Sequence, residues 1–392
     1  MFCYMPFILL GAIFSVVLLD GVIPVYAKSF VYALSLTTKS FVVFLLPAVI
    51  FMLLFKTIVQ FAGRATKLLF LIFAAVIGSN FLSTMISYQV GSLVYQLNLS
   101  IVAPLLEGEG LSPLWDFSLP SVIGNDVAIF AGIILGIVFS FFKTHLREKI
   151  SLCFERWVAF LLRIFVSIIP VFLIGFLVKL VHDRVIVSIM SDYALIFAIV
   201  AAAQFGYILF LYLSANRFKI AGFLRSVKNM LPAGIAGFSS MSSAAAMPLT
   251  IVGAEKNMKD PNFARLSIPT TVNIHLIGDC FAIPIFAFAV MKSFGVAEPG
   301  FYTYLVFAVY FVMAKFSVAA IPGGGIIVML PFLESCLGFN AEMASLITAL
   351  YILFDPVITS ANVLGNGAFS QGLSRLSDLV SSFSIRMRDA ML

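Results

Sequence analysis

Two long apolar segments of this chain are each interrupted near the middle by a run of small residues. The first interruption is Ser-Ser-Met-Ser-Ser-Ala-Ala-Ala-Met-Pro at 239–248, and the second is Ile-Pro-Gly-Gly-Gly at 321–325. Backbone that leaves the helix at membrane depth must be buried in protein or line a wet cavity, because lipid cannot satisfy its polar groups. Paired interruptions of this kind point to a binding site at the middle of the membrane. The two breaks therefore predict a fold in which both of them line a substrate path.

The composition requires lipid as the solvent for most of the chain. Of its 392 residues, 62% are hydrophobic and 11% are charged, and the mean hydropathy is +1.11. Soluble domains are about 45–50% apolar and about 25% charged. The net charge of +6 is spread over short links, which argues against a nucleic-acid partner and indicates a membrane-topology signal. The four cysteines are scattered without the spacing of a metal site.

Apolar segments long enough to span a bilayer, about 20 residues each, recur along the chain. The candidate segments are Phe7–Ala27, Ser40–Phe61, Leu68–Leu93, Ser121–Phe142, Trp157–Val181, Tyr193–Ser214, the interrupted Ala233–Ala254, Phe263–Met291, the interrupted Phe301–Leu337, and Ala341–Leu364.

Basic residues gather in the links after the second, fourth and sixth of these segments. They are Lys56, Arg64, Lys67, Lys143, Arg147, Lys149, Arg156, Arg217, Lys219, Arg225 and Lys228. The long link after the third segment carries acidic residues and neither Lys nor Arg. Because cytoplasmic links are enriched in basic residues, we expect a multi-pass protein of the plasma (cell inner) membrane with a cytoplasmic amino terminus.

The same rule decides how the interrupted segments run. Lys256 and Lys259 fall on the basic side only if Ala233–Ala254 enters the membrane and returns, and Arg375 does so only if Phe301–Leu337 also returns. The sequence therefore predicts an all-α polytopic membrane protein. It would have about eight transmembrane helices and two re-entrant helical hairpins that enter from opposite faces.

The last apolar segment carries a polar stripe. Asp355, Thr359, Asn362 and Asn366 are spaced i, i+4, i+7 and i+11, which places them on one face of a helix. A carboxylate within an apolar helix costs at least about 2.5–3.5 kcal/mol on insertion, so it must face a partner or a cavity. The stripe therefore either binds a ligand or joins neighbouring helices through hydrogen bonds. The two hairpins beside it favour the ligand interpretation.

Four stretches in the carboxy-terminal half together resemble the dicarboxylate/amino acid:cation symporter family, the glutamate-transporter-like proteins. In order they are Met241–Pro248, Asn273-Ile-His275, Ile321–Gly325 and Asp355–Asn366. The first and third are similar to the family's hairpin tips. The second is similar to the break in its seventh helix, and the last is similar to the binding stretch of its eighth.

The resemblance implies a division of the chain and a mode of action. Residues 1–222 would be mainly scaffold and trimerisation helices, with the third and sixth spans belonging to the transport core. Residues 223–378 would be the transport core, and 379–392 a cytoplasmic tail. The protein would be a homotrimer that carries a small amino acid or dicarboxylate across the lipid bilayer by an elevator-like motion. A cation gradient, of sodium by family, would drive it without any other cofactor.

The resemblance also implies roles for individual residues. Asp355 would take the substrate's ammonium group, and Thr359 and Asn362 would hydrogen-bond its amino and carboxylate groups. Ser242 and Ser243, at the start of a half-helix, would offer backbone N–H groups to a carboxylate. Gly323 and Gly324 would form a moving gate. A sodium ion would be coordinated by a set of amide side chains: Asn273, Asn362 and Asn366.

At three positions the chain departs from the family pattern. Ile358 stands where members with acidic substrates have an arginine, so a bidentate clamp for a side-chain carboxylate is missing. His275 and Asn366 replace two carboxylates, which weakens the case for sodium. An imidazole changes charge near neutral pH, so His275 with Asp279 four residues later is a candidate proton-coupling pair. Lys315, in the second interrupted segment, could compensate for the missing arginine, but we expect it to snorkel to the membrane interface.

Two other classes of protein remain as alternatives at this stage. Gly278-Asp279 and Asp355 would fit a membrane-embedded aspartyl-type hydrolase only if the two carboxylates shared a proton. A pore or a sensor related to the transporters would keep the fold without coupled transport. The sequence has no phosphate loop, nucleophile elbow or metal-binding motif, so we expect a transporter rather than an enzyme.

Overall fold

The computed structural model describes residues 15–16, 18–63, 67–97, 110–120, 123–142, 144–183, 193–316, 318 and 323–389. Over these residues the protein is helical and has no β-strand, so the all-α fold is confirmed. The helices are α2 (Val25–Gly63), α3 (Lys67–Gln96), α4 (Asn125–Ser140), α5 (Thr144–His182), α7 (Ala194–Ala215), α8 (Ile220–Ser240), α9 (Ser243–Glu255), α10 (Pro261–Thr271), α11 (Ile277–Ser293), α12 (Phe301–Lys315), α13 (Gly324–Leu337) and α14 (Ala341–Asp389).

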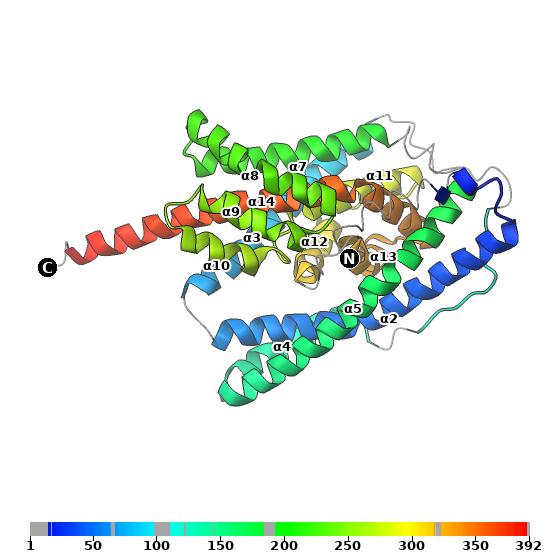
Figure 1. Ribbon diagram of the computed structural model, residues 1–392, viewed down its shortest axis with the longest axis horizontal. Coiled ribbons are helices and arrows are strands. Elements are labelled where there is room, and N and C mark those ends of the chain that lie inside the picture. Colours follow the sequence, from blue (N-terminus) through cyan, green and yellow to red (C-terminus); the bar gives the residue numbers. More distant parts are fainter. Residues whose placement is uncertain are drawn as a thin grey trace.

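The helices form two groups. Helices α4 and α5 pack on α2 and lie along one side of the molecule (Figure 1). The other helices surround α14, which runs through the middle of the second group (Figure 1). Although α3 is early in the sequence, it packs on α11 and α12, and α7 packs on α14 and α11. In the second group, α11 is buried at every residue from Ile277 to Met291.

Helices α8 and α9 form a first helical hairpin that turns at Met241. Met241 has a left-handed backbone conformation, with φ 51°, which ends α8. At the open end of the hairpin, Asn229 Nδ2 donates to Asn257 Oδ1 at 2.8 Å, so the two arms are antiparallel. Gly237, one turn before the tip, packs against the Thr359 carbonyl of α14. This hairpin reaches α14 from its carboxy-terminal end.

Helices α12 and α13 form a second helical hairpin, in which Tyr310 and Phe332 stack across the two arms with ring centroids 6.1 Å apart. The tip residue Gly323 is left-handed, with φ 70°. The Gly323 N–H donates to Asp355 of α14, and α13 ends just before α14 begins. This hairpin therefore reaches α14 from its amino-terminal end, opposite to the first.

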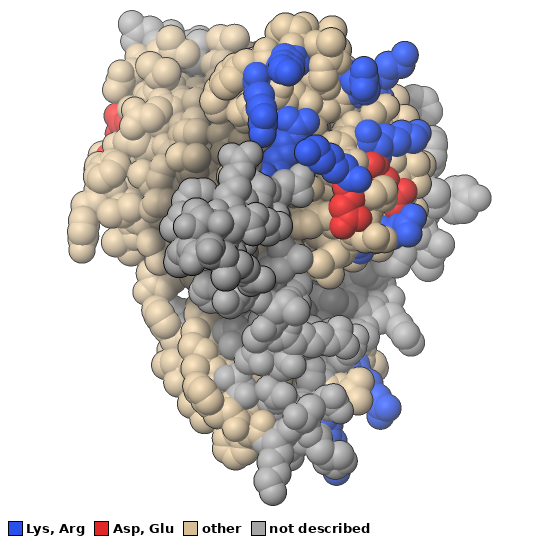
Figure 2. All heavy atoms as spheres, turned by 90° about the vertical axis from the view of Figure 1, so that its left-hand side faces the viewer, with Lys and Arg blue, Asp and Glu red and all other residues tan. Residues whose placement is uncertain are grey.

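The ends of the helices that flank the basic links lie at one end of the molecule. The α7–α8 and α9–α10 links, the end of α2, the start of α5 and the carboxy terminus are all at the left of Figure 1. Seen from that end, Lys and Arg side chains gather over part of the surface, with a few acidic side chains among them (Figure 2). Basic residues gathered at one end of the helices are in line with the positive-inside rule.

Several helices are longer than the hydropathy of the sequence indicates. Helix α2 begins at Val25 rather than Ser40, and α5 begins at Thr144 rather than Trp157. The last helix extends to Asp389 and includes most of the expected tail. Apolar content identifies only the part of a helix that lies in the hydrocarbon core of the membrane. Helical hydrogen bonding continues beyond it into the polar flanking residues. Of the expected first span, Phe7–Ala27, the structure describes residues 15–16 and 18–27; the chain turns at 20–22, and α2 begins at Val25.

Within the described residues, three helices are long and apolar enough to cross a membrane. They are Leu71–Gln96, Ala194–Ala215 and Ala341–Leu376. Shorter apolar helices cover Val127–Phe139, Phe301–Lys315 and Gly324–Leu337.

Candidate functional site

The site is built around a break between α10 and α11. α10 ends at Thr271 and α11 begins at Ile277. Asn80 of α3 bonds to backbone groups that have no helical partner in this break. Its Nδ2 donates to the Ile274 carbonyl at 2.7 Å, and its Oδ1 accepts from the Leu276 N–H at 3.3 Å. A buried backbone group without a partner costs about 1–3 kcal/mol, and the Asn80 amide avoids this cost for two groups of the break. The predicted break at Asn273-Ile-His275 is confirmed.

Asn362 of α14 caps the start of α11. Its Oδ1 accepts from the Gly278 N–H at 2.8 Å and from the Asp279 N–H at 3.4 Å. Because a backbone N–H can only donate, these bonds fix the orientation of the amide, and Asn362 Nδ2 must face the Asp279 carboxylate, 3.2 Å from Oδ1. Gly278 lets the two helices approach this closely, since a side chain there would meet the Ile358 carbonyl.

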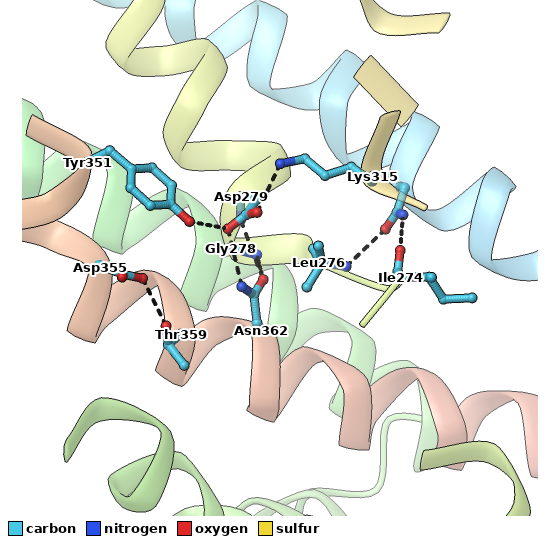
Figure 3. A network of polar contacts seen from close by, with 10 residues as sticks. Ile274, Leu276, Gly278, Asp279, Lys315, Tyr351, Asp355, Thr359 and Asn362 are labelled. Atoms are coloured by element: carbon cyan, nitrogen blue, oxygen red, sulfur yellow. Dashed lines mark hydrogen bonds and ion pairs between the residues drawn. The ribbon is translucent and has the colours of Figure 1, made fainter. Parts of the chain in front are cut away.

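Asp279 is the centre of the polar cluster and is 1% exposed. Its Oδ1 accepts from the Tyr351 hydroxyl at 3.1 Å as well as from Asn362, and its Oδ2 accepts from Lys315 Nζ at 2.9 Å. Figure 3 shows the carboxylate between the tyrosine and the lysine, which come from α14 and α12. Lys315 is 0% exposed, and its ammonium also lies 4.5 Å from the centroid of the Phe311 ring. The expectation that Lys315 snorkels to the interface is therefore wrong, because a buried carboxylate holds it in the core.

Asp355 lies one turn after Tyr351 on α14 and joins that helix to the second hairpin. Its Oδ2 accepts from the Gly323 N–H at 2.9 Å, and its Oδ1 accepts from the Thr359 hydroxyl at 3.0 Å (Figure 3 draws the second bond). Asp355 is 3% exposed. Two neutral donors leave its negative charge without a cationic partner among these contacts. Gly324 is buried beside Gly323 at the same tip, whose residues Ile321 and Pro322 lie outside the described part of the chain.

The tip of the first hairpin is a capped half-helix start. Ser242 is the N-cap of α9, with its side chain accepting from the Ala245 N–H at 3.3 Å. The Ser240 hydroxyl closes the turn, donating to the Ser242 carbonyl at 3.2 Å. Ser243 is buried in the first turn of α9. Gly237, one turn before this tip, lies against Val363 and the Thr359 carbonyl of α14, so the first hairpin packs on α14 beyond the place where the second tip bonds to Asp355.

His275 lies in the break but has different partners from those expected. Its Nε2 is 2.9 Å from the Ser79 hydroxyl of α3, and its ring stacks on Phe369 with centroids 4.1 Å apart. The His275 Nδ1 atom is buried without a hydrogen bond. The expected pairing of His275 with Asp279 is therefore wrong. The residues after Thr271 are not helical, so an i, i+4 spacing does not place these two side chains together.

The three amide side chains expected to share a cation are in different surroundings. Asn366 Oδ1 accepts from the Thr271 hydroxyl at 2.6 Å, and Asn362 is engaged by the start of α11. Asn273 is exposed, whereas Asn362 and Asn366 are buried. Each of the two buried amides thus uses its side-chain oxygen for a hydrogen bond within the protein. Ile358 is 0% exposed and contributes an apolar side chain at the position of the missing clamp.

This buried cluster contains two carboxyl groups, Asp279 and Asp355, and one ammonium group, Lys315. The second carboxyl group is available to a positively charged partner, such as an ammonium group, a proton or a metal cation. In the part of the chain that the structure describes, no group of three or more His, Cys, Asp or Glu residues forms a metal centre.

Sequence reasoning missed Asn80 and Tyr351. A signal for the first was present, because Asn80, Thr84 and Ser87 form a polar stripe within an apolar helix. Tyr351 has no such signal, since a tyrosine in an apolar segment is ordinary. Its position one turn before Asp355, on the same face, is informative only once the stripe is known to bind.

Comparison with known proteins gives two matches. The model of the sodium:dicarboxylate symporter family matches residues 126–376, a region that includes both hairpins, the α10–α11 break and the Asp355–Asn366 stretch. An excitatory amino acid transporter of Onchocerca volvulus is 27% identical over 176 residues. That similarity covers 42% of this chain and 35% of the relative, so the chain matches about a third of the relative's length.

Proposed function

Because this chain belongs to the sodium:dicarboxylate symporter family, we propose that it is a secondary active symporter for a small amino acid or dicarboxylate. Uptake would be coupled to a cation gradient. Membership of a transporter family also supports a role other than that of an enzyme.

The observation that carries the proposal is the convergence of three interrupted elements on one stretch of α14. The tip of the second hairpin bonds to Asp355, the first hairpin packs on Thr359, and the start of α11 bonds to Asn362. Backbone N–H and C=O groups released from helices are thus gathered beside a buried carboxylate. Half-helix ends beside a carboxylate suit a small zwitterion, because they offer fixed partial charges of both signs.

The residues favour a neutral amino acid over a dicarboxylate. Asp355 would receive the substrate ammonium in place of the Gly323 N–H, and Thr359 and Asn362 would hydrogen-bond the amino and carboxylate groups. The half-helix start at Ser242 and Ser243 would take the carboxylate. A second carboxylate would have no free cation, since Ile358 is apolar and Lys315 is engaged by Asp279.

Two coupling ions are compatible with this site. Sodium is the expectation from the family, with Asn362, Asn366 and backbone carbonyls as ligands and Asn273 nearby in the chain. The rival is a proton carried by His275, whose Nδ1 is buried without a hydrogen bond. The loss of two family carboxylates favours the proton.

The architecture would follow the family as well. The two helical hairpins would be re-entrant from opposite membrane faces, and α2, α4 and α5 would form the scaffold of a homotrimer. The remaining helices would move as the transport core. The basic end in Figure 2 would face the cytoplasm at the plasma membrane.

Uptake into proteoliposomes tests the proposal. Labelled neutral and acidic amino acids would be offered separately under a sodium gradient and under a proton gradient. We expect concentrative uptake of a neutral amino acid under one of the two. Ionic current without accumulation would instead indicate a pore, and binding without flux would indicate a sensor.

A membrane-embedded aspartyl hydrolase has no support from the geometry. Such an enzyme needs two carboxylates that share a proton. Asp279 is held by Lys315, Tyr351 and Asn362, whereas Asp355 is held by Gly323 and Thr359. Each carboxylate thus has its own set of donors.

A further inference from the structure

The buried ion pair between α12 and α11 has a place in the site that packing alone does not explain. Lys315 and Asp279 are 0% and 1% exposed. Taking the two charges out of water costs several kcal/mol for each ion. Apolar residues of similar size often serve stability as well or better. We propose that Lys315 is a built-in cation: its ammonium occupies, on the Asp279 carboxylate, the position that a monovalent metal cation would otherwise fill.

The ammonium lies on a carboxylate that also accepts from a hydroxyl. Nζ is 2.9 Å from Asp279 Oδ2, and the other oxygen of that carboxylate is 3.1 Å from the Tyr351 hydroxyl. Asn362 donates its Nδ2 to the same carboxylate and so orients it rather than offering an oxygen. Carboxylate and hydroxyl oxygens are hard ligands of the kind that alkali and alkaline-earth cations prefer. Removing the lysine side chain would leave this set facing a space once filled by a positive charge.

The built-in cation belongs to the element that would move. Lys315 is the last residue of α12, the first arm of the second hairpin, and Gly325 of the other arm also packs against Asp279 and Tyr351. Both arms of the hairpin therefore meet the same carboxylate. When the second hairpin packs on α14, the Lys315 ammonium lies on Asp279. When the hairpin moves away, Asp279 loses its counter-ion. A bound metal ion would do the same work, but it would bring a dependence on its concentration.

Charge balance separates this carboxylate from Asp355. Lys315 neutralises Asp279, and the remaining negative charge is on Asp355, one turn beyond Tyr351 on α14. The inference rests on the proposed function for the role of Asp355, which takes the exchangeable positive charge of substrate or coupling ion. It adds that Asp279 needs no soluble cation. The wild-type protein would thus use one cation fewer than a version without the lysine.

The test measures cation binding to the purified full-length protein without any substrate. Apparent melting temperatures would be recorded while NaCl replaces choline chloride at constant total chloride. A cation that binds only the folded state raises stability with the logarithm of its concentration. For Lys315→Ala we expect the melting temperature to rise by several degrees over a hundredfold increase in sodium concentration. The slope of melting temperature against the logarithm of sodium concentration should exceed the wild-type slope by the contribution of one bound ion.

Two controls define the result. Lys28→Ala removes another buried lysine, which is in α2 and pairs with Asp20 at 2.6 Å, and should keep the wild-type slope. The double variant Asp279→Asn/Lys315→Met removes both charges and should also keep the wild-type slope, because no carboxylate remains to bind sodium.

Each outcome is decisive. A wild-type slope in Lys315→Ala would overturn the inference. If Lys315→Ala folds in sodium but not in choline, the inference is supported more strongly. If it folds in neither salt while the double variant folds, sodium cannot replace the lysine and the inference fails. If neither variant folds, Lys315 acts through packing, and the inference fails again. Because no transport is measured, failure of the proposed function would leave these results unaffected.

Discussion

Gly278 is the position where α11 and α14 approach most closely within the site, and adding one methyl group there should disable it. A Cβ atom at Gly278 would lie far inside van der Waals contact with the Ile358 carbonyl and 3.0 Å from Asn362 Oδ1. Carbon–oxygen contacts settle at about 3.3–3.6 Å, so the two helices must separate by about 1 Å. The 2.8 Å bond from the Gly278 N–H to Asn362 would then exceed hydrogen-bonding distance.

The size of the effect follows from these displacements. Overpacking costs about 1–3 kcal/mol, from which up to about 1 kcal/mol of helix propensity gained by Ala must be subtracted. A misplacement of about 1 Å in a site can cost about a hundredfold in rate. For Gly278→Ala we therefore expect a modest loss of stability and a loss of uptake of about two orders of magnitude.

A matched glycine separates the two contributions. Gly372 is in α14, the helix that Gly278 packs against, and a Cβ there would meet no atom within 4 Å. Gly372→Ala should therefore melt at or above the wild-type temperature with unchanged uptake. Melting curves and initial uptake rates in proteoliposomes would be recorded for both variants. Wild-type uptake by Gly278→Ala would refute the reasoning that the Asn362–α11 contact positions the site.

Three further variants and one control address the binding site, its selectivity and the gate. Asp355→Ala should abolish uptake while the protein remains folded and monodisperse in detergent; uptake near the wild-type rate would remove Asp355 from the binding site. Ile358→Arg should raise the ratio of acidic to neutral amino acid uptake about tenfold, since hydrogen bonds to charged groups contribute about 1.5–3 kcal/mol, and competition uptake assays would detect it. Gly323→Ala and Gly295→Ala place a side chain at φ 70° and 67° without a steric clash, so each should lower stability by about 1–2 kcal/mol in melting experiments, but only Gly323→Ala should change substrate affinity.

The parts of the site that lie on one regular element could be predicted from the sequence. Asp355, Thr359 and Asn362 share a helical face by spacing alone, and the structure keeps Asp355 and Asn362 in contact with interrupted elements. The breaks themselves were visible as small residues and proline within apolar runs. Helical periodicity and the cost of burying polar groups act locally, so they are readable without the fold.

Pairings across elements could not be predicted in the same way. A lone lysine near a helix end usually extends to water, which is why the sequence predicts that Lys315 reaches the interface. The structure buries it against Asp279, 36 residues away in sequence. Helical spacing pairs His275 with Asp279, but the break redirects it to Ser79 and Phe369. Partner choice depends on how helices are placed in space, and residue spacing along one chain does not reveal that placement.

The bond between Asp355 and the second hairpin links substrate binding to the position of the gate. In this structure the Asp355 carboxylate accepts from the Gly323 N–H, a neutral donor at the hairpin tip. A substrate ammonium carries three donors and a full charge, so it competes for the same oxygen with a stronger interaction. The hairpin must then lose this bond or share it, and seating it again requires new contacts with the substrate. A ligand shifts a conformational equilibrium only by its difference in affinity for the two states. The substrate can therefore favour a closed gate only if its own groups replace what Gly323 gives up.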